Sequence, residues 1–248
     1  MAGGADDEPR RQELATALAA VRRRIAAACA AAGRAESTVA LVAVTKTYPA
    51  SDVALLADLG VGDVGENRDQ EAAAKAAAVR AAGVALRWHF VGQLQRNKCA
   101  SVAGYADVVH SVDSVRLAEA LARAVERHRD RDRPLDVLVQ VSIDGDQARG
   151  GAVPGGADPD RAVQRVADTL AAAASLRLAG VMAVAPMGWA PEVAFARLAE
   201  VAARLRADHP GATAVSAGMS GDLEAAIGHG ATHVRVGSAL LGRRPALR

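Results

Sequence analysis

The chain has 248 residues, of which 51% are hydrophobic and 23% are charged, and its formal net charge at pH 7 is +2. This composition excludes a mostly disordered chain, and the small net charge gives no indication of binding to nucleic acids or membranes. The two cysteines, Cys29 and Cys99, fit neither a disulfide framework nor a metal site, so we expect reduced, buried thiols. Because no apolar stretch is long enough to span a membrane and the amino terminus lacks a signal-peptide pattern, we expect a cytoplasmic protein.

The first predicted element is an amphipathic helix over residues 10–33, which ends at Gly33. Short apolar or β-branched runs then alternate with Ala-rich stretches of helical spacing. The runs that predict strands are VALVAV (39–44), VGDVG (61–65), LRWHFV (86–91), DVVHSV (107–112), LDVLVQVSI (135–143), LRLAGVMAV (176–184), ATAVSA (212–217) and THVRVG (232–237). The stretches between them that predict helices include 52–60, 70–83, 114–129, 159–174, 191–207 and 219–230.

Eight strands that alternate with helices predict an α/β protein whose parallel strands close into a (β/α)8 TIM barrel. The barrel would begin near residue 39, after the amino-terminal helix, and form one domain over residues 1–248. A doubly wound open sheet is the alternative, but VTKTYPAS, after the first predicted strand, contains no glycine fingerprint for phosphates. The Gly-, Pro- and Asp-rich segment 144–160 is interpreted as an insertion or a mobile surface loop.

Lys46 follows the first predicted strand, in a chain whose basic residues are almost all arginines. Only three of the 30 basic residues are lysines, and a lysine, unlike an arginine, can lose its proton and act as a nucleophile. In a barrel the carboxyl ends of the strands meet at one face, so Lys46 should lie opposite Arg235 and the Gly237–Ser238 turn. Backbone N–H groups and a hydroxyl at such a turn suit a phosphate, and a recessed amine reacts with aldehydes. Together they indicate pyridoxal 5'-phosphate (PLP) or a phosphorylated sugar.

Each of these residues also has a simpler interpretation. Lys46 could form an ion pair with Glu66, His89 could be a structural histidine, and Gly237–Ser238 could be an ordinary turn. Arg235 is harder to explain in this way, because a guanidinium within an apolar strand requires a partner. The convergence of these residues on one face of the barrel therefore favours a functional site.

Several segments resemble the pyridoxal phosphate homeostasis protein family over nearly the whole chain. They are VAVTKTYP (42–49), VGEN (64–67), WHFVGQLQRNK (88–98), GVMAV (180–184), SAGMSGDLEAAI (216–227) and VRVGSALLG (234–242). The resemblance implies a barrel similar to the amino-terminal domain of alanine racemase, which is fold-type III among PLP-binding proteins. It also implies that Lys46 holds PLP as a Schiff base. The other cofactor-binding residues that it implies are Ser216, Gly237 and Ser238 at the phosphate, Arg235 at the pyridine nitrogen, and Asn67, His89, Met182 and Met219 around the site.

An arginine at the pyridine nitrogen, in place of an aspartate, weakens the stabilisation of a carbanion. In alanine racemases a tyrosine from a second domain acts as the opposing base, whereas this chain contains only Tyr48 and Tyr105. We therefore expect a PLP-binding protein that buffers or delivers PLP without robust catalysis, and we assign no catalytic residue. A fold-type III amino-acid racemase and a Schiff-base aldolase acting on a sugar phosphate are the alternatives. We further expect a monomer without metal or nucleic acid that makes transient contacts with PLP-dependent enzymes.

Overall fold

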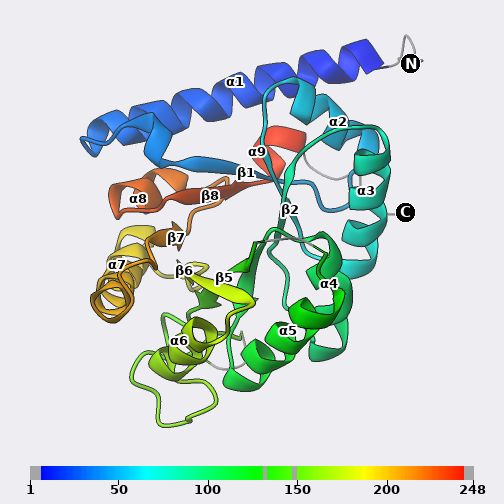
Figure 1. Ribbon diagram of the computed structural model, residues 1–248. Helices are drawn as coiled ribbons and strands as arrows, with labels where there is room; N and C mark the ends of the chain where they lie inside the picture. Colours follow the sequence, from blue (N-terminus) through cyan, green and yellow to red (C-terminus); the bar gives the residue numbers. More distant parts are fainter. Residues whose placement is uncertain (1–6, 131–132, 147–149, 243–248) are drawn as a thin grey trace.

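Eight parallel strands close into a barrel in the computed structural model, which describes residues 7–130, 133–146 and 150–242 (Figure 1). The strands pair in chain order, and β8 pairs with β1. They are β1 (Ala40–Val44), β2 (Asp63–Glu66), β3 (Arg87–Phe90), β4 (Val108–Val112), β5 (Leu135–Gln140), β6 (Leu176–Met182), β7 (Ala214–Ser216) and β8 (His233–Val236). Each strand overlaps one of the predicted runs. The (β/α)8 TIM barrel is therefore confirmed, and the open-sheet alternative is excluded.

Helices cover the outside of the barrel and connect its strands. They are α2 (Ala50–Asp58), α3 (Asp69–Ala81), α4 (Cys99–Tyr105), α5 (Val115–His128), α6 (Val163–Ala172), α7 (Pro191–Asp208), α8 (Leu223–Gly228) and α9 (Ser238–Leu241), with 3-10 turns at Glu36–Thr38 and Arg96–Lys98. In α5, Leu117, Leu121 and Val125 recur every four residues and are all buried, which gives this helix one apolar face. The helix predicted over 219–230 is shorter, because residues 219–222 form a turn before α8 begins.

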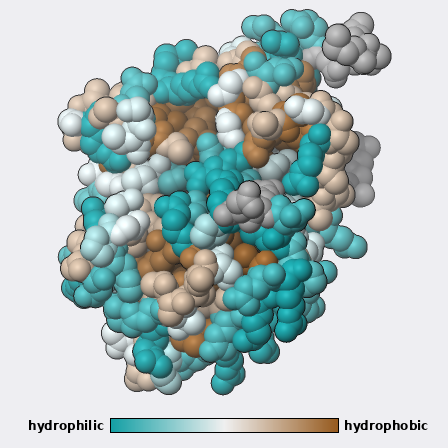
Figure 2. Space-filling model, in the orientation of Figure 1, coloured by the Kyte–Doolittle hydropathy of each residue, from teal (hydrophilic) through white to brown (hydrophobic). Residues whose placement is uncertain are grey.

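The predicted amino-terminal helix is confirmed as α1 (Asp7–Ala31), which lies across the outside of the barrel and contacts α2, α8 and α9 (Figure 1). Its buried residues Leu14, Leu18, Val21 and Ile25 are spaced three or four apart and therefore share one face. Burying each of these side chains contributes about 1.5–3 kcal/mol. Figure 2 shows apolar side chains mainly in hollows between hydrophilic groups, including a strip directly beneath this helix. The helix thus packs the first part of the chain against the last.

The barrel interior contains both apolar and polar side chains. Val108, Leu138, Ala179 and Met182 form a small buried cluster of strand residues only, separate from the large core between the strands and the helices. Buried polar side chains from four other positions on the strands accompany this cluster: His89, His110, Ser216 and Arg235. Because buried polar groups need hydrogen-bond partners, these four must be satisfied inside the protein.

The segment 144–160 is attached to the barrel at several points. Backbone bridges join Val141 to Ala152 and Val153 to Ala162. Asp113, just after β4, accepts a hydrogen bond of 3.2 Å from the Gly151 N–H. Residues 147–149 of the predicted loop lie outside the described residues.

Both cysteines are buried and free, as the sequence predicted. Burial raises the pKa of the Cys99 thiol to about 11, which keeps it protonated and unreactive.

Within the described residues, no helix combines the length and the apolar character that crossing a membrane requires.

Candidate functional site

A cavity of about 510 Å³ opens at the carboxyl-terminal ends of the strands. Residues at or just after the ends of β1, β2, β3, β6, β7 and β8 line it: Val44, Lys46, Asn67, Val91, Gly92, Met182, Val184, Met219, Ser220, Gly221, Arg235, Gly237 and Ser238. Of the predicted site residues, the cavity collects Lys46, Asn67, Met182, Met219, Arg235, Gly237 and Ser238. His89 and Ser216 do not line it. A cavity of this volume accommodates a small organic ligand.

Lys46 lies two residues after the end of β1 and is partly buried in the cavity wall. Among the described residues, no group forms a hydrogen bond or an ion pair with its amine. The alternative ion pair with Glu66 is not formed, because the Glu66 carboxylate is bound by the Lys75 amine at 2.5 Å. The Lys46 amine is therefore available to a ligand.

A buried polar cluster supports the segment around the cavity lysine. The Lys75 amine donates to the Thr45 carbonyl at 2.9 Å and pairs with Glu66 and Glu71. Thr45 donates its hydroxyl to Glu66 at 2.6 Å, and the Thr47 N–H donates to Glu71. Thr47 has a φ of +70°, which is unusual for a β-branched residue and turns the chain sharply. Lys75 lies in the Ala-rich stretch 70–83, whose helical spacing is typical of a surface helix, yet its side chain is only 5% exposed.

Arg235 presents a buried cation to the cavity. Its guanidinium donates to the Ser216 hydroxyl oxygen at 2.7 Å and to the Ala183 carbonyl at 3.0 Å. Burial lowers the pKa of this guanidinium to about 10, a value at which it still carries its charge at neutral pH. In the described part of the chain, no carboxylate lies within ion-pair distance of it. A buried arginine paired only with neutral oxygens can donate to an electron-rich group of a ligand.

Two turns, Met219–Gly221 and Gly237–Ser238, lie together in the cavity wall. Ser220 joins them, because its Oγ accepts hydrogen bonds from the Ser238 hydroxyl and the Ala239 N–H, both at 3.2 Å. No described protein group accepts a hydrogen bond from the backbone N–H groups of four residues in these turns: Ser220, Gly221, Gly237 and Ser238. Free N–H groups next to hydroxyls form a binding site for an anion.

The turn at Ser220 is also held from outside the barrel by α1. The Arg24 guanidinium donates to the Ser220 carbonyl at 3.0 Å and to both carboxylate oxygens of Glu224 at 2.6 and 2.8 Å. On the other side, Asp222 accepts a hydrogen bond of 2.6 Å from the Met219 N–H. Ser220 lies within the segment GMSGDLEAAI but was not predicted, and Arg24 had no sequence signal because its partners lie about 200 residues later.

The predicted residues His89 and Ser216 lie beneath the cavity, inside the barrel. The His89 ring binds Asp63 through Nε2 and His110 through Nδ1, both at 2.8 Å. The Ser216 Oγ lies 2.9 Å from His110 Nδ1 and accepts the bond from Arg235. Both predicted residues therefore connect to the cavity through Arg235. Sequence reasoning did not include His110, although its strand ends at the same face.

Asn67 reaches the cavity because the segments after β2 and β3 approach each other closely. A Cβ atom on Gly92 would lie 2.1 Å from the Asn67 carbonyl oxygen, so only glycine fits at this position. Val44, Val91 and Val184 supply apolar wall next to these residues. Apart from their positions at strand ends, nothing in the sequence marked these valines as cavity residues.

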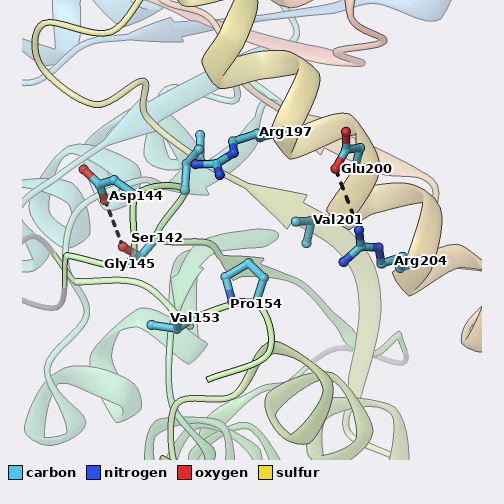
Figure 3. Close-up of a pocket in the computed structure, with 10 residues that line it drawn as sticks. Ser142, Asp144, Gly145, Val153, Pro154, Arg197, Glu200, Val201 and Arg204 are labelled. Atoms are coloured by element: carbon cyan, nitrogen blue, oxygen red, sulfur yellow. Dashed lines mark hydrogen bonds and ion pairs between the residues drawn. The ribbon is translucent and has the colours of Figure 1, made fainter. Parts of the chain in front are cut away.

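A second cavity, of about 350 Å³, lies between the segment after β5 and α7 (Figure 3). Its charged groups mostly bind one another or neighbouring protein groups. Ser142 donates to Asp144 at 3.2 Å, Arg204 pairs with Glu200 at 3.8 Å, and the Arg197 guanidinium lies over the Trp189 ring (Figure 3 shows the first two pairs). No predicted site residue lines it.

Neither tyrosine lines the first cavity. Tyr48 donates its hydroxyl to the Gly242 carbonyl at 2.9 Å, and the Arg10 guanidinium lies over its ring. Tyr105, the last residue of α4, is buried in the core, and burial raises its pKa. Among the described residues, no group of three or more His, Cys, Asp or Glu side chains is arranged to hold a metal ion.

The barrel and its strand-end cavity define the class of protein. Residues 16–245 match the family model described as "Alanine racemase, N-terminal domain", so the chain belongs to that family. The solved alanine racemase of Corynebacterium glutamicum shares the fold, with a TM-score of 0.62 and 17% identity over 96% of this chain and 63% of the racemase chain.

Two further comparisons narrow this class. The pyridoxal phosphate homeostasis protein of Mycobacterium bovis is 48% identical over 250 residues, which cover 95% of this chain and 94% of that protein. PipY of Synechococcus elongatus PCC7942, solved with PLP bound, has a TM-score of 0.75 and 32% identity over 92% of this chain and 100% of the PipY chain. The chain is a member of the pyridoxal phosphate homeostasis protein family.

Proposed function

We propose that this protein binds PLP, with Lys46 forming the Schiff base, and that it buffers or delivers PLP in the cell without robust catalysis. One observation carries the proposal. Counting only partners within the described residues, the same cavity holds an amine without a protein partner, a buried guanidinium without a carboxylate, and free backbone N–H groups in two turns. The name of the Mycobacterium bovis relative and the PLP bound to PipY support it.

The donor set of the cavity fits PLP. PLP supplies an aldehyde, which reacts with primary amines, and Lys46 is the lysine that lines the cavity. Arg235 has a donor for the pyridine nitrogen, and the two turns have N–H groups and hydroxyls for the phosphate. Asn67 and the two methionines, Met182 and Met219, would line the remaining walls.

The same residues favour a carrier over a racemase. With an arginine at the pyridine nitrogen, the ring would be a weaker electron sink than with an aspartate. Racemisation also needs a second base opposite Lys46, and neither Tyr48 nor Tyr105 lines the cavity. Val184 and Met219 in the cavity wall are 43% and 40% exposed, so solvent has access to a bound ligand.

The attachment to Lys46 is tested by borohydride reduction of the PLP-loaded protein, followed by intact mass and peptide mapping. We expect one added pyridoxyl phosphate group, located on Lys46. Lys46→Ala should abolish the addition, whereas the matched control Lys98→Ala should keep it, because Lys98 lies outside the cavity and is 44% exposed. Mapping of the group to Lys98, or its retention in Lys46→Ala, would contradict the proposal.

The carrier role is tested by two measurements on the PLP-loaded protein. We expect transfer of PLP to the apo form of a PLP-dependent enzyme, faster than from the borohydride-reduced protein. In heavy water we expect no substantial loss of the α-hydrogen signal of alanine or serine. Rapid loss of that signal would instead establish an amino-acid racemase.

We further propose a cytoplasmic monomer with one domain that meets its recipient enzymes only transiently. The exposed large hydrophobic side chains among the described residues are Val184, Met187, Val193 and Met219. Val184 and Met219 line the cavity, and the other two follow in the segment from β6 to α7. Apolar side chains at this edge would suit brief docking beside the cofactor. Light scattering at rising concentration tests the monomer, and a stable dimer would contradict it.

A further inference from the structure

A continuous row of hydrogen bonds runs through the interior of the barrel. Asp63 on β2, His89 on β3, His110 on β4, Ser216 on β7 and Arg235 on β8 form it in that order. The successive distances are 2.8 Å, 2.8 Å, 2.9 Å and 2.7 Å. The two histidines and the serine are at most 1% exposed, so water does not compete for these bonds.

With Asp63 ionised and both imidazoles neutral, the row has only one direction. Asp63 as a carboxylate can only accept, so His89 carries its proton on Nε2 and donates to it. The unprotonated Nδ1 of His89 then accepts from His110, which carries its proton on Nε2. His110 Nδ1 accepts in turn from the Ser216 hydroxyl, whose oxygen accepts from Arg235, a group that can only donate.

The protonation states support the same direction. Burial lowers the pKa of His89 and, together with the neighbouring His89 and Arg235, lowers the pKa of His110 well below its usual range. Both imidazoles are therefore neutral near pH 7. Burial alone would raise the pKa of Asp63, but the hydrogen bond from His89 and the nearby Arg87 guanidinium lower it, so this carboxyl is ionised.

The two ends of the row lie at opposite ends of the barrel. Arg235 lines the cavity at the carboxyl-terminal ends of the strands. Asp63 is the first residue of β2, and it lines a separate cavity of about 310 Å³ together with Glu36 and Arg22. Its side chain is 24% exposed. The row therefore places a negative charge four hydrogen bonds away from the buried guanidinium.

We propose that Asp63, His89 and His110 are positioning residues for Arg235, which they hold through the Ser216 hydroxyl with its free donors towards the cavity. A carboxylate in direct contact would bind several of the guanidinium donors. Two neutral imidazoles and a hydroxyl instead present a single oriented acceptor, and the Ala183 carbonyl takes one more N–H, so the other donors stay available. The expected effect on PLP binding rests on the proposed function. The direction of the hydrogen bonds in the row does not, because it is a property of the protein without a ligand.

The direction is tested by ¹⁵N NMR of the histidine side chains in the protein without PLP, at about pH 7. The chain has six histidines, so single His→Gln variants suffice to assign their signals. We expect His89 and His110 to be neutral, each with its proton on Nε2. A proton on Nδ1 of either ring, or a doubly protonated ring, would overturn the proposal.

The positioning role is tested with Asp63→Ala and, at the other end of the row, Ser216→Ala. Asp63→Ala should leave His89 and His110 as mixtures of tautomers and weaken PLP binding by about three- to tenfold, the net value of one oriented hydrogen bond. Ser216→Ala should weaken PLP binding by at least as much. The matched control Glu36→Gln, an exposed acid in the same lower cavity, should change neither quantity.

The outcomes separate the two proposals. Unchanged tautomers and an unchanged PLP dissociation constant in Asp63→Ala would overturn the positioning role. If the unaltered protein binds no PLP, the proposed function fails, while the tautomers of His89 and His110 still decide the direction of the row. Circular dichroism confirms that each variant is folded, and if Asp63→Ala is unfolded, Ser216→Ala and the spectra of the unaltered protein decide.

Discussion

Removing the Lys75 amine should destabilise the protein strongly, although the residue lies in an Ala-rich helix. The amine is buried against Glu66, Glu71 and the Thr45 carbonyl. Lys75→Met keeps the apolar stem of the side chain as far as Cε but leaves Glu66, which is 0% exposed, without its cation. Removal of one partner of a buried ion pair costs about 3–5 kcal/mol, because an uncompensated charge remains. For a chain of this size that corresponds to a fall in Tm of about 6–20 °C.

The loss should depend on pH in a defined direction. Burial raises the pKa of Glu66 above its ordinary value even beside Lys75, and the pKa should rise further in Lys75→Met. The folded state then binds a proton more tightly than the unfolded state, so stability falls as pH rises. The deficit should therefore be larger at about pH 8 than at about pH 5.

Urea denaturation of Lys75→Met and of the unaltered protein at the two pH values measures the loss of stability. We expect a lower urea midpoint for the variant, with an unchanged dependence of the unfolding free energy on urea concentration. Lys98→Met is the matched control, because Lys98 is 44% exposed and its ion pair with Asp69 is long, at 3.8 Å. This variant should change stability by less than about 1 kcal/mol. A deficit below about 1 kcal/mol for Lys75→Met, or a larger deficit at low pH, would refute the reasoning.

Four further outcomes are expected. Gly92→Ala should lower stability by about 1–3 kcal/mol in thermal unfolding, because its Cβ would lie 2.1 Å from the Asn67 carbonyl oxygen; an unchanged Tm would contradict this contact. Leu18→Ala in α1 should cost about 2–5 kcal/mol in urea, and a smaller value would mean that α1 packs loosely. Burial lowers the pKa of His233 to about 4, so as the pH falls the unfolded chain binds the proton first, and stability should fall between about pH 6.5 and pH 4. In denaturation curves, His233→Gln should reduce this dependence of stability on pH. Arg235→Lys should raise the PLP dissociation constant about tenfold in absorbance titrations, since an ammonium cannot reproduce the planar set of donors, and equal affinity would remove Arg235 from the site.

The barrel was predictable because its strands are short, apolar and separated by helical spacing. Runs such as DVVHSV are buried on both faces, which is the mark of a parallel strand between helices and a barrel interior. Helix α4 was not predicted, because its seven residues give too few turns for a period to appear. The start of α8 was placed too early, since Met219–Asp222 have helix-forming neighbours but turn to reach the cavity.

The cavity residues could be predicted wherever they follow a strand directly. Lys46 and Arg235 stood out because a charge beside or within an apolar run is unexpected. The buried ion pair of Lys75 could not be predicted from the sequence. Its partner Glu66 lies on the preceding strand, and the Ala-rich pattern around Lys75 indicates only a helix. Ser220 and Arg24 meet across nearly the whole chain, and no local pattern reports such a contact.

The contact of α1 with the turn at Ser220 has a consequence for the order in which the molecule is completed. Arg24 emerges early during synthesis, but the carbonyl and carboxylate that it binds are made only after residue 219. Arg10 likewise donates to the Leu241 carbonyl at 3.2 Å. Contacts between such distant parts of a chain form late in folding. A ribosome-bound fragment that ends before this turn therefore lacks the anion-binding groups, and under the proposed function a partly made chain would not hold PLP.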